Sequence, residues 1–181
     1  MRKLFITGES GMLATSIIKA LEESEIDKFE VMDNTDLAEY TNDFSYLNGE
    51  LVKPKEVDVT DRDVLSKVAK RLTSDDIIIH TAAYVNTDKC DDFSYEAVNS
   101  NIISTQFLID VATSVGCKLI YFSTTAVFDP DEYMKNNGEF DETAPIDPKT
   151  LYGLSKYSGE LATKQSMDFD KMMVIKPVFI Y

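Results

Sequence analysis

The chain has 181 residues, 44% of them apolar and 28% charged, a composition typical of a globular domain with a full hydrophobic core. Its formal net charge of -14 argues against nucleic acid and anionic membrane surfaces as partners, because both carry charge of the same sign. The apolar runs are too short for a signal peptide or a membrane span, so we expect a cytoplasmic protein.

Apolar runs of strand length alternate along the chain with longer segments of helical period. The predicted strands are residues 3–7, 29–32, 56–59, 77–79, 118–123 and 172–175. The predicted helices are residues 12–23, 61–72, 95–115 and 150–165, the second of them capped by Thr60 or Asp61. Residues 34–53 are expected to be irregular, and residues 129–148, which contain three prolines, to form a long loop.

This alternation predicts an α/β fold of the Rossmann type, a doubly wound parallel sheet with helices on both faces. Ligands of such sheets bind at the carboxyl ends of the strands, so the residues that follow each strand are the candidate site residues. The whole chain, residues 1–181, is expected to form one such domain.

A glycine-containing loop follows the first strand and opens the first helix, which is the context that a dinucleotide-binding loop requires. Gly8 permits the tight turn, and Gly11 allows backbone amides to approach a pyrophosphate at the helix N-terminus. The third glycine of the usual pattern is replaced by Ala14, which is small enough for close helix–strand packing. The residues expected to contact the cofactor here are Gly8, Ser10, Gly11, Met12 and Leu13.

Asp33 follows the second strand and lies 25 residues beyond Gly8, where an acidic side chain can accept hydrogen bonds from the adenosine ribose. An acidic residue there favours NAD over NADP, because it would repel a 2′-phosphate. The alternative is that Asp33 and its neighbour Asn34 form a turn or a helix cap. NAD is therefore the expected cofactor, with NADP left open.

Tyr152 and Lys156 are four residues apart and share one face of the last predicted helix. An ammonium group beside a phenol stabilises the phenolate, which makes the phenol usable in acid–base chemistry near neutral pH. A chain of this composition contains about one such pair by chance, so the pair alone is weak support for catalysis.

Gly8, Gly11, Asp33, Thr81-Ala82-Ala83, Asn99, Ser123-Thr124 and Tyr152-x-x-x-Lys156 fall in this order along the chain. With these motifs the chain resembles the extended short-chain dehydrogenase/reductase family, whose members mostly act on nucleotide sugars. Ala82-Ala83-Tyr84 and the run Ser123 to Asp129 are most similar to the dTDP-4-dehydrorhamnose reductases within that family. The resemblance implies an NAD(P)-dependent reductase of a 4-ketosugar.

The resemblance also implies roles for individual residues. Tyr152 would protonate the substrate oxygen, Thr124 would hydrogen-bond the same carbonyl, and Lys156 would hold the nicotinamide ribose and lower the tyrosine pKa. Asn99 would support the active-site end. The remaining residues that would lie along the cofactor are Asp58, Val59, Thr81, Ala82, Ala83, Tyr84, Asn99 and Pro177, together with Tyr152 itself.

Two departures from the family pattern bear on the reaction. Dehydratases of the family place an acid and a base where this chain has Thr125 and Ala126, which cannot exchange a proton near pH 7, so dehydration is disfavoured and epimerisation stays open. Relatives also continue for about another hundred residues after the segment that ends here, with a small lobe that grips the nucleotide sugar. A non-catalytic NAD(P)-binding regulatory subunit is therefore a second alternative.

Relatives often dimerise through the helices that begin near Tyr95 and Thr150, so a homodimer is expected from the resemblance alone.

Three further groups of side chains have simple structural interpretations. His80 ends a β-branched strand and is expected to be a packed residue, because one imidazole cannot make a metal site. Cys90 and Cys117 are expected to be packed thiols. The acidic residues of the long loop lack ligand spacing, so no metal is expected.

Overall fold

The computed structural model describes residues 2–8, 11–23, 29–32, 46–47, 50–51, 58–90, 92–131 and 143–177. Its centre is a five-stranded parallel sheet in the order β2-β1-β5-β6-β7. These strands are β1 (Arg2–Thr7), β2 (Phe29–Met32), β5 (Ile77–His80), β6 (Lys118–Phe122) and β7 (Met172–Ile175). From β1 the chain adds β2 on one side of that strand and later adds β5 on its other side. Doubly wound sheets bind nucleotides at such a switch in the order of the strands.

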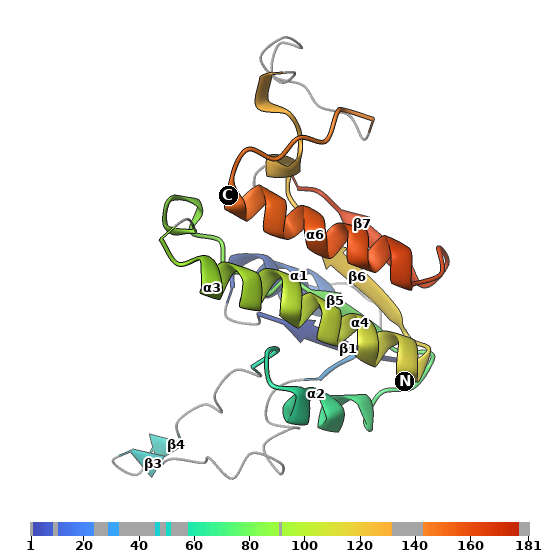
Figure 1. The fold of residues 1–181 in the computed structure, drawn as a ribbon. Coiled ribbons are helices and arrows are strands. Elements are labelled where there is room, and N and C mark those ends of the chain that lie inside the picture. The colour runs from blue at the N-terminus through green and yellow to red at the C-terminus, as the bar shows by residue number, and fades with distance from the viewer. Residues whose placement is uncertain are drawn as a thin grey trace.

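The helices follow the strands in alternation (Figure 1). They are α1 (Met12–Glu23), α2 (Arg62–Ala69), α3 (Ser94–Val98), α4 (Ser104–Val115) and α6 (Leu151–Ser166). Three short helical segments complete the described part, namely η2 (Thr87–Lys89), η3 (Asn99–Ile103), which is π-helical, and η4 (Thr125–Val127). None of the described helices has both the length and the apolarity that a membrane crossing requires.

The two faces of the sheet bury different residues because successive side chains of a strand point in opposite directions. Phe5, Ile78 and Leu119 belong to one apolar cluster with residues of α2 and α4. Leu4, Ile6 and Ile79 belong to a second cluster with residues of α1. Helices α2, α4 and α6 lie side by side, as Figure 1 shows. The expected doubly wound sheet with helices on both faces is therefore confirmed.

The strand predicted at residues 56–59 is wrong in its described half. Asp58 is in no strand and Val59 lies in a turn, while Glu56 and Val57 lie outside the described residues. The Asp58 carboxylate accepts hydrogen bonds from the backbone amide and the hydroxyl of Thr60 at 2.9 Å and 2.6 Å. A side chain that binds its own backbone in this way competes with strand pairing, and the apolar Val59 is buried against α2 instead.

Two other predictions need smaller corrections, and the structure decides between the two caps expected for the second predicted helix. The stretch 34–53, expected to be irregular, contains a two-stranded antiparallel pair, β3 (Tyr46–Leu47) with β4 (Glu50–Leu51). The helix predicted at 95–115 is one helical run, but it changes to π-helical geometry at Asn99–Ile103. Asp61 rather than Thr60 caps α2, since its carboxylate accepts from the amides of Asp63 and Val64 at 2.8 Å and 3.2 Å.

Candidate active site

The register of the sheet brings the candidate residues to one edge. Thr7 pairs with His80, His80 with Tyr121, and Phe122 with Ile175, so the carboxyl ends of four strands meet there. The segments that leave this edge begin with Gly8, Thr81, Ser123 and Lys176. Residues that are far apart in the sequence, such as Ala82 and Thr124, are thereby placed along the same edge.

The loops after β1 and β5 are fastened to each other. Thr7 Oγ1 accepts a hydrogen bond from the amide of Ala82 at 3.1 Å, and Thr81 Oγ1 donates to the carbonyl of Thr7 at 2.5 Å. Gly8 has a φ of 71°, and a Cβ there would lie 2.9 Å from the backbone of Ala82, so only glycine fits. The amide of Gly11 closes the turn on the carbonyl of Gly8 at 2.8 Å. The first-turn amides of α1 therefore start directly at this edge.

His80 is fully buried and supports the loops after β1 and β5 through its hydrogen bonds. Its Nδ1 lies 2.8 Å from Thr7 Oγ1 and its Nε2 lies 3.0 Å from Thr105 Oγ1. Burial lowers the pKa of His80 to about 3, so the imidazole is neutral. The structure thus confirms the packed role expected for His80, and both cysteines are buried, as expected.

Thr124 and Tyr152 meet at the junction of η4 and α6. Thr124 caps η4, with its Oγ1 accepting from the amide of Ala126 at 3.2 Å. Thr150 caps α6, with its Oγ1 accepting from the amide of Gly153 at 3.0 Å, which puts Tyr152 in the first turn. The Thr124 side chain lies close enough to the Tyr152 phenol to favour the ionised form of that phenol. Two of the three expected catalytic groups are therefore neighbours.

The pKa of the Tyr152 phenol is raised, which corrects the expectation that Lys156 lowers it. Burial is the largest cause, the Thr124 side chain acts in the opposite direction, and the nearby Cys90 thiol adds a smaller rise. The charge of Lys156 is not among the causes. Burial disfavours the charged forms of both groups, the phenolate and the ammonium.

Lys156 is 3% exposed, and no described carboxylate forms an ion pair with it. Its Nζ lies 4.4 Å from the centre of the Tyr121 ring, and the Tyr121 hydroxyl donates to the backbone carbonyl of Lys156 at 3.0 Å. Burial lowers the pKa of Lys156 to about 7. The amine therefore loses its proton far more readily than an ordinary lysine, and it lies on the same helix as Tyr152, one turn further on.

Gly153, between Tyr152 and Lys156, is required by close packing. A Cβ at this position would lie closer than 3.0 Å to the carbonyl oxygen of Ala126 and 3.1 Å from Pro148 Cβ. We therefore expect Gly153→Ala to push the start of α6 away from η4, lowering stability by about 1–3 kcal/mol through overpacking. Thermal denaturation checks this, and Ala162→Gly in the same helix is the control for helix propensity. An unchanged melting temperature would contradict the close contact.

Asn101, rather than Asn99, supports the active-site end. Its side chain is 1% exposed, and its Oδ1 accepts from the amide of Tyr84 at 2.7 Å. Its Nδ2 donates to the Tyr84 carbonyl at 3.1 Å and to Ser155 Oγ at 2.9 Å, and Ser155 Oγ donates to the carbonyl of Tyr152 at 2.8 Å. This chain of contacts ties the loop after β5 to α6. Sequence reasoning missed Asn101, although it lies on the same stripe as the buried Thr105, Leu108 and Ala112.

The other expected cofactor residues divide into three groups. Ala82, Ala83 and Tyr84 are half-buried along the loop after β5, and Pro177 is half-buried just after β7. At the start of α1, Met12 is exposed and Leu13 is half-buried. The Asp58 carboxylate accepts a hydrogen bond from the amide of Thr60, and Val59 packs in the core. The expected contacts of Ser10, Asp33 and Asn34 lie outside the described residues.

A model of the RmlD substrate binding domain family matches residues 1–181. The chain belongs to this family. The resemblance to the extended short-chain dehydrogenases and to the dTDP-4-dehydrorhamnose reductases among them is thereby confirmed. A dTDP-4-dehydrorhamnose reductase of Aggregatibacter actinomycetemcomitans is 29% identical over 160 residues, which cover 88% of this chain and 46% of that protein.

Solved structures agree with the fold. The dTDP-4-dehydrorhamnose reductase of Bacillus anthracis in complex with NADP matches with a TM-score of 0.75 and 24% identity, covering 100% of this chain and 55% of that chain. The UDP-Glc/GlcNAc 4-epimerase of Campylobacter jejuni matches with a TM-score of 0.71 and 20% identity, covering 97% of this chain and 53% of that chain. The present chain thus spans about half the length of these relatives.

Proposed function

We propose that the protein is an NAD(P)-dependent oxidoreductase that reduces the 4-keto group of a nucleotide sugar. The observation that carries this proposal is the placement of the Thr124 hydroxyl beside the Tyr152 phenol at the carboxyl edge of the sheet. Reduction of a ketone develops negative charge on its oxygen, and two preorganised hydroxyl donors stabilise that charge. The reductase named among the relatives supports the same reaction class.

The residues present fit a dinucleotide. A side chain at Gly8 would fill the space against the backbone of Ala82, and the glycine turn leads straight into a helix of 12 residues whose first-turn amides are suited to phosphate. Gly8, Gly11 and Met12 would hold the pyrophosphate, Ala82 and Ala83 would line the ribose, and Lys156 would bind the second ribose. When bound, the nicotinamide would supply the hydride.

Within this proposal, Tyr152 acts as the proton donor. Its raised pKa keeps the phenol protonated at neutral pH, which is the state that a donor to a ketone oxygen must be in. The phenolic proton passes from Oη to the substrate oxygen, and the Thr124 hydroxyl hydrogen-bonds the same oxygen. Lys156, whose pKa burial lowers to about 7, would hold the nicotinamide ribose one helical turn further on.

Epimerisation is the second candidate reaction, and a fold neighbour is a 4-epimerase. The same hydroxyl pair would serve both reactions, because an epimerase removes and returns a hydrogen at one carbon. Dehydration is disfavoured because η4 carries Thr125 and Ala126, whose side chains do not exchange protons near pH 7. A regulatory subunit that binds the dinucleotide without catalysis is the third alternative, and the fold alone does not decide between them.

The experiment is a fluorescence titration of the full-length protein with NADPH and then NADH, followed by addition of a dTDP-4-keto-6-deoxy sugar. Binding of either cofactor with its stoichiometric oxidation on adding the sugar supports the reductase. Sugar interconversion without net cofactor oxidation indicates an epimerase. Binding without turnover of any sugar favours the subunit. Absence of binding to both cofactors contradicts the proposal.

The cofactor titration also tests the NAD preference expected from Asp33. An acidic residue beside the adenosine ribose would weaken NADPH relative to NADH, whereas the Bacillus anthracis reductase was solved with NADP. Equal affinities, or tighter NADPH, would show that Asp33 does not contact the ribose. The affinities of Asp33→Ala for NADPH and NADH show whether repulsion between this carboxylate and the 2′-phosphate causes any preference for NADH.

A further inference from the structure

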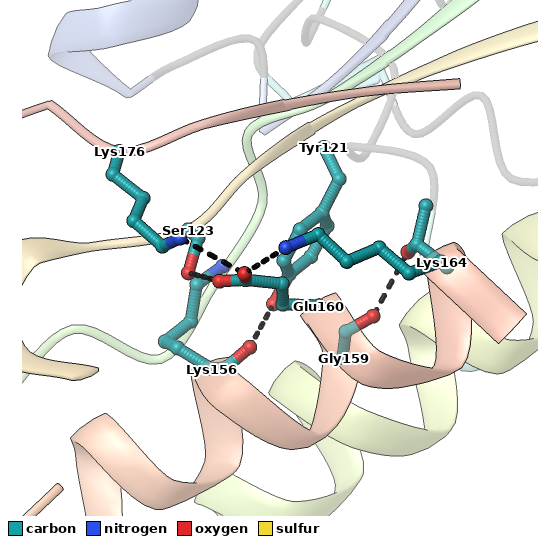
Figure 2. Close-up of polar contacts among 8 residues, drawn as sticks. Tyr121, Ser123, Lys156, Gly159, Glu160, Lys164 and Lys176 are labelled. Atoms are coloured by element: carbon teal, nitrogen blue, oxygen red, sulfur yellow. Dashed lines mark hydrogen bonds and ion pairs between the residues drawn. The ribbon is translucent and has the colours of Figure 1, made fainter. Parts of the chain in front are cut away.

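A buried carboxylate lies one helical turn beyond Lys156. Glu160 on α6 is 1% exposed, and Figure 2 shows it at the centre of a cluster of polar side chains. Its Oε1 accepts from Lys164 Nζ at 2.6 Å and from Lys176 Nζ at 2.9 Å. Its Oε2 accepts from Ser123 Oγ at 3.1 Å. Both carboxylate oxygens thus accept from donors, two on Oε1 and one on Oε2, and the three donors come from different parts of the chain.

The carboxylate is ionised despite its burial. Burial alone would raise the pKa of Glu160, but the hydrogen bonds and charges of Lys164 and Lys176 outweigh it and lower the pKa. A buried ion pair is a costly way to hold a helix on a sheet, since apolar side chains of similar volume usually stabilise as well or better. Directional contacts fix relative position more sharply than apolar ones, so the cluster is better suited to setting geometry than to adding stability.

The partners of Glu160 belong to the segments that carry the proposed active site. Ser123 immediately precedes Thr124 at the end of β6, and Lys176 immediately precedes Pro177 at the end of β7. Lys176 is itself braced, with its Nζ 5.2 Å from the centre of the Phe128 ring, just after η4. Lys164 differs from these two, because it lies on the same helix as Glu160 and its side chain is 46% exposed.

We propose that Glu160 is a positioning residue: its hydrogen bond from Ser123 and its ion pair with Lys176 set the register of α6 against the ends of β6 and β7, and so place the Tyr152 phenol beside Thr124. This inference rests on the proposed function. Glu160 touches neither reacting hydroxyl and acts through the segments that carry them. Loss of either cross-element contact allows the helix to slide, and a displacement of about 1 Å at the reacting atoms costs on the order of 100-fold in rate.

The two lysines provide a matched pair of variants, because both place an ammonium on the same carboxylate oxygen. We expect Lys176→Met and Glu160→Gln to lower kcat by about 30-fold or more, with KM and cofactor affinity within about 3-fold of the native values. Lys164→Met, which removes only a contact within the helix, is expected to stay within about 2-fold. Lys176→Arg keeps the charge and is expected to recover most of the rate lost in Lys176→Met.

A second measurement does not depend on turnover. In protein with ¹³C-labelled tyrosine rings, the Tyr152 resonance, assigned through Tyr152→Phe, is expected to shift in Lys176→Met and not in Lys164→Met. Native kcat in Lys176→Met, or an equal loss in Lys164→Met, would overturn the positioning role. Lower stability with native kcat would also overturn it. If the native protein binds cofactor but turns over no sugar, the proposed function fails, and the resonance alone decides whether Glu160 positions Tyr152.

Discussion

Tyr152→Phe is expected to lower the rate of hydride transfer by about 10³-fold while cofactor affinity stays within a few fold. General acid catalysis typically contributes 10²–10⁴-fold, and the phenylalanine ring keeps the packing of the first turn of α6 while removing only the donor. The Thr124 hydroxyl keeps its contact with the Ala126 amide, so the oxygen on the other side stays in place. Single-turnover kinetics with preloaded NADPH measures the chemical step directly.

Tyr157→Phe is the matched control, because Tyr157 is half-buried on the same helix and lies outside the proposed site. Its rate is expected to be native within about 2-fold, since it makes no contact with substrate in the proposal. Native turnover in Tyr152→Phe would remove the phenol from the mechanism. An equal loss in both variants would point to disturbance of the helix rather than to loss of a proton donor.

The sheet and its edge could be predicted from the sequence because they depend on local patterns. Runs such as Ile77-Ile78-Ile79 are strand-like wherever they occur, and alternation of strands with helices admits few topologies. Once the order of strands is known, the residues after each strand must share an edge, which is why Gly8, Ala82 and Thr124 could be grouped without coordinates. Their roles toward a cofactor stay predictions.

The failures come from choices that local pattern does not decide. Asp58 could extend a strand or bind its own backbone, and the outcome depended on what followed, a helix that Asp61 caps. Asn99 and Asn101 have the same chemistry two residues apart. Only the π-helical turn and the packing of α4 on the sheet show that Asn101 is the buried one.

The acid–base properties of Tyr152 and Lys156 were the least predictable from sequence. Their spacing correctly suggested a shared helix, but the sign of a pKa shift depends on desolvation by residues from the whole fold. The Lys156 ammonium lies over the ring of Tyr121, from β6, whereas the sequence predicted that it would lie beside the phenol of Tyr152. Glu160 was overlooked for the same reason, since its partners Ser123 and Lys176 are distant in sequence.

Lys156→Met is expected to stabilise the protein while it removes the amine that the proposed reaction uses. The ammonium is 3% exposed with a pKa near 7 in the fold, against 10.5 ordinarily. Below about pH 7 the folded chain bears the full cost of burying this charge, and methionine of similar shape avoids it. After allowance for the lost contact with the Tyr121 ring, the gain should be about 1–3 kcal/mol, or roughly 5 °C in melting temperature.

The sign of the pH dependence follows from proton binding. Between about pH 7 and pH 10.5 the unfolded chain keeps the Lys156 proton that the folded chain has lost, so this group's contribution to stability rises with pH. The advantage of Lys156→Met is therefore largest below pH 7 and vanishes near pH 10.5. The difference between the two proteins must be measured, because burial also raises the pKa of Cys117 to about 11 and that of Tyr121, which lowers the stability of both proteins in alkali.

Chemical denaturation at intervals from pH 6 to pH 10 measures this difference. Lys19→Met is the control, since its side chain is 73% exposed and its removal should change stability by less than about 0.5 kcal/mol at every pH. A Lys156→Met protein that is less stable than native at pH 6, or whose difference from native is independent of pH, would mean that Lys156 is not a destabilising buried charge. In that case the amine would be fully protonated at neutral pH, and Lys156 could hold the phenolate of Tyr152 without taking up a proton during turnover.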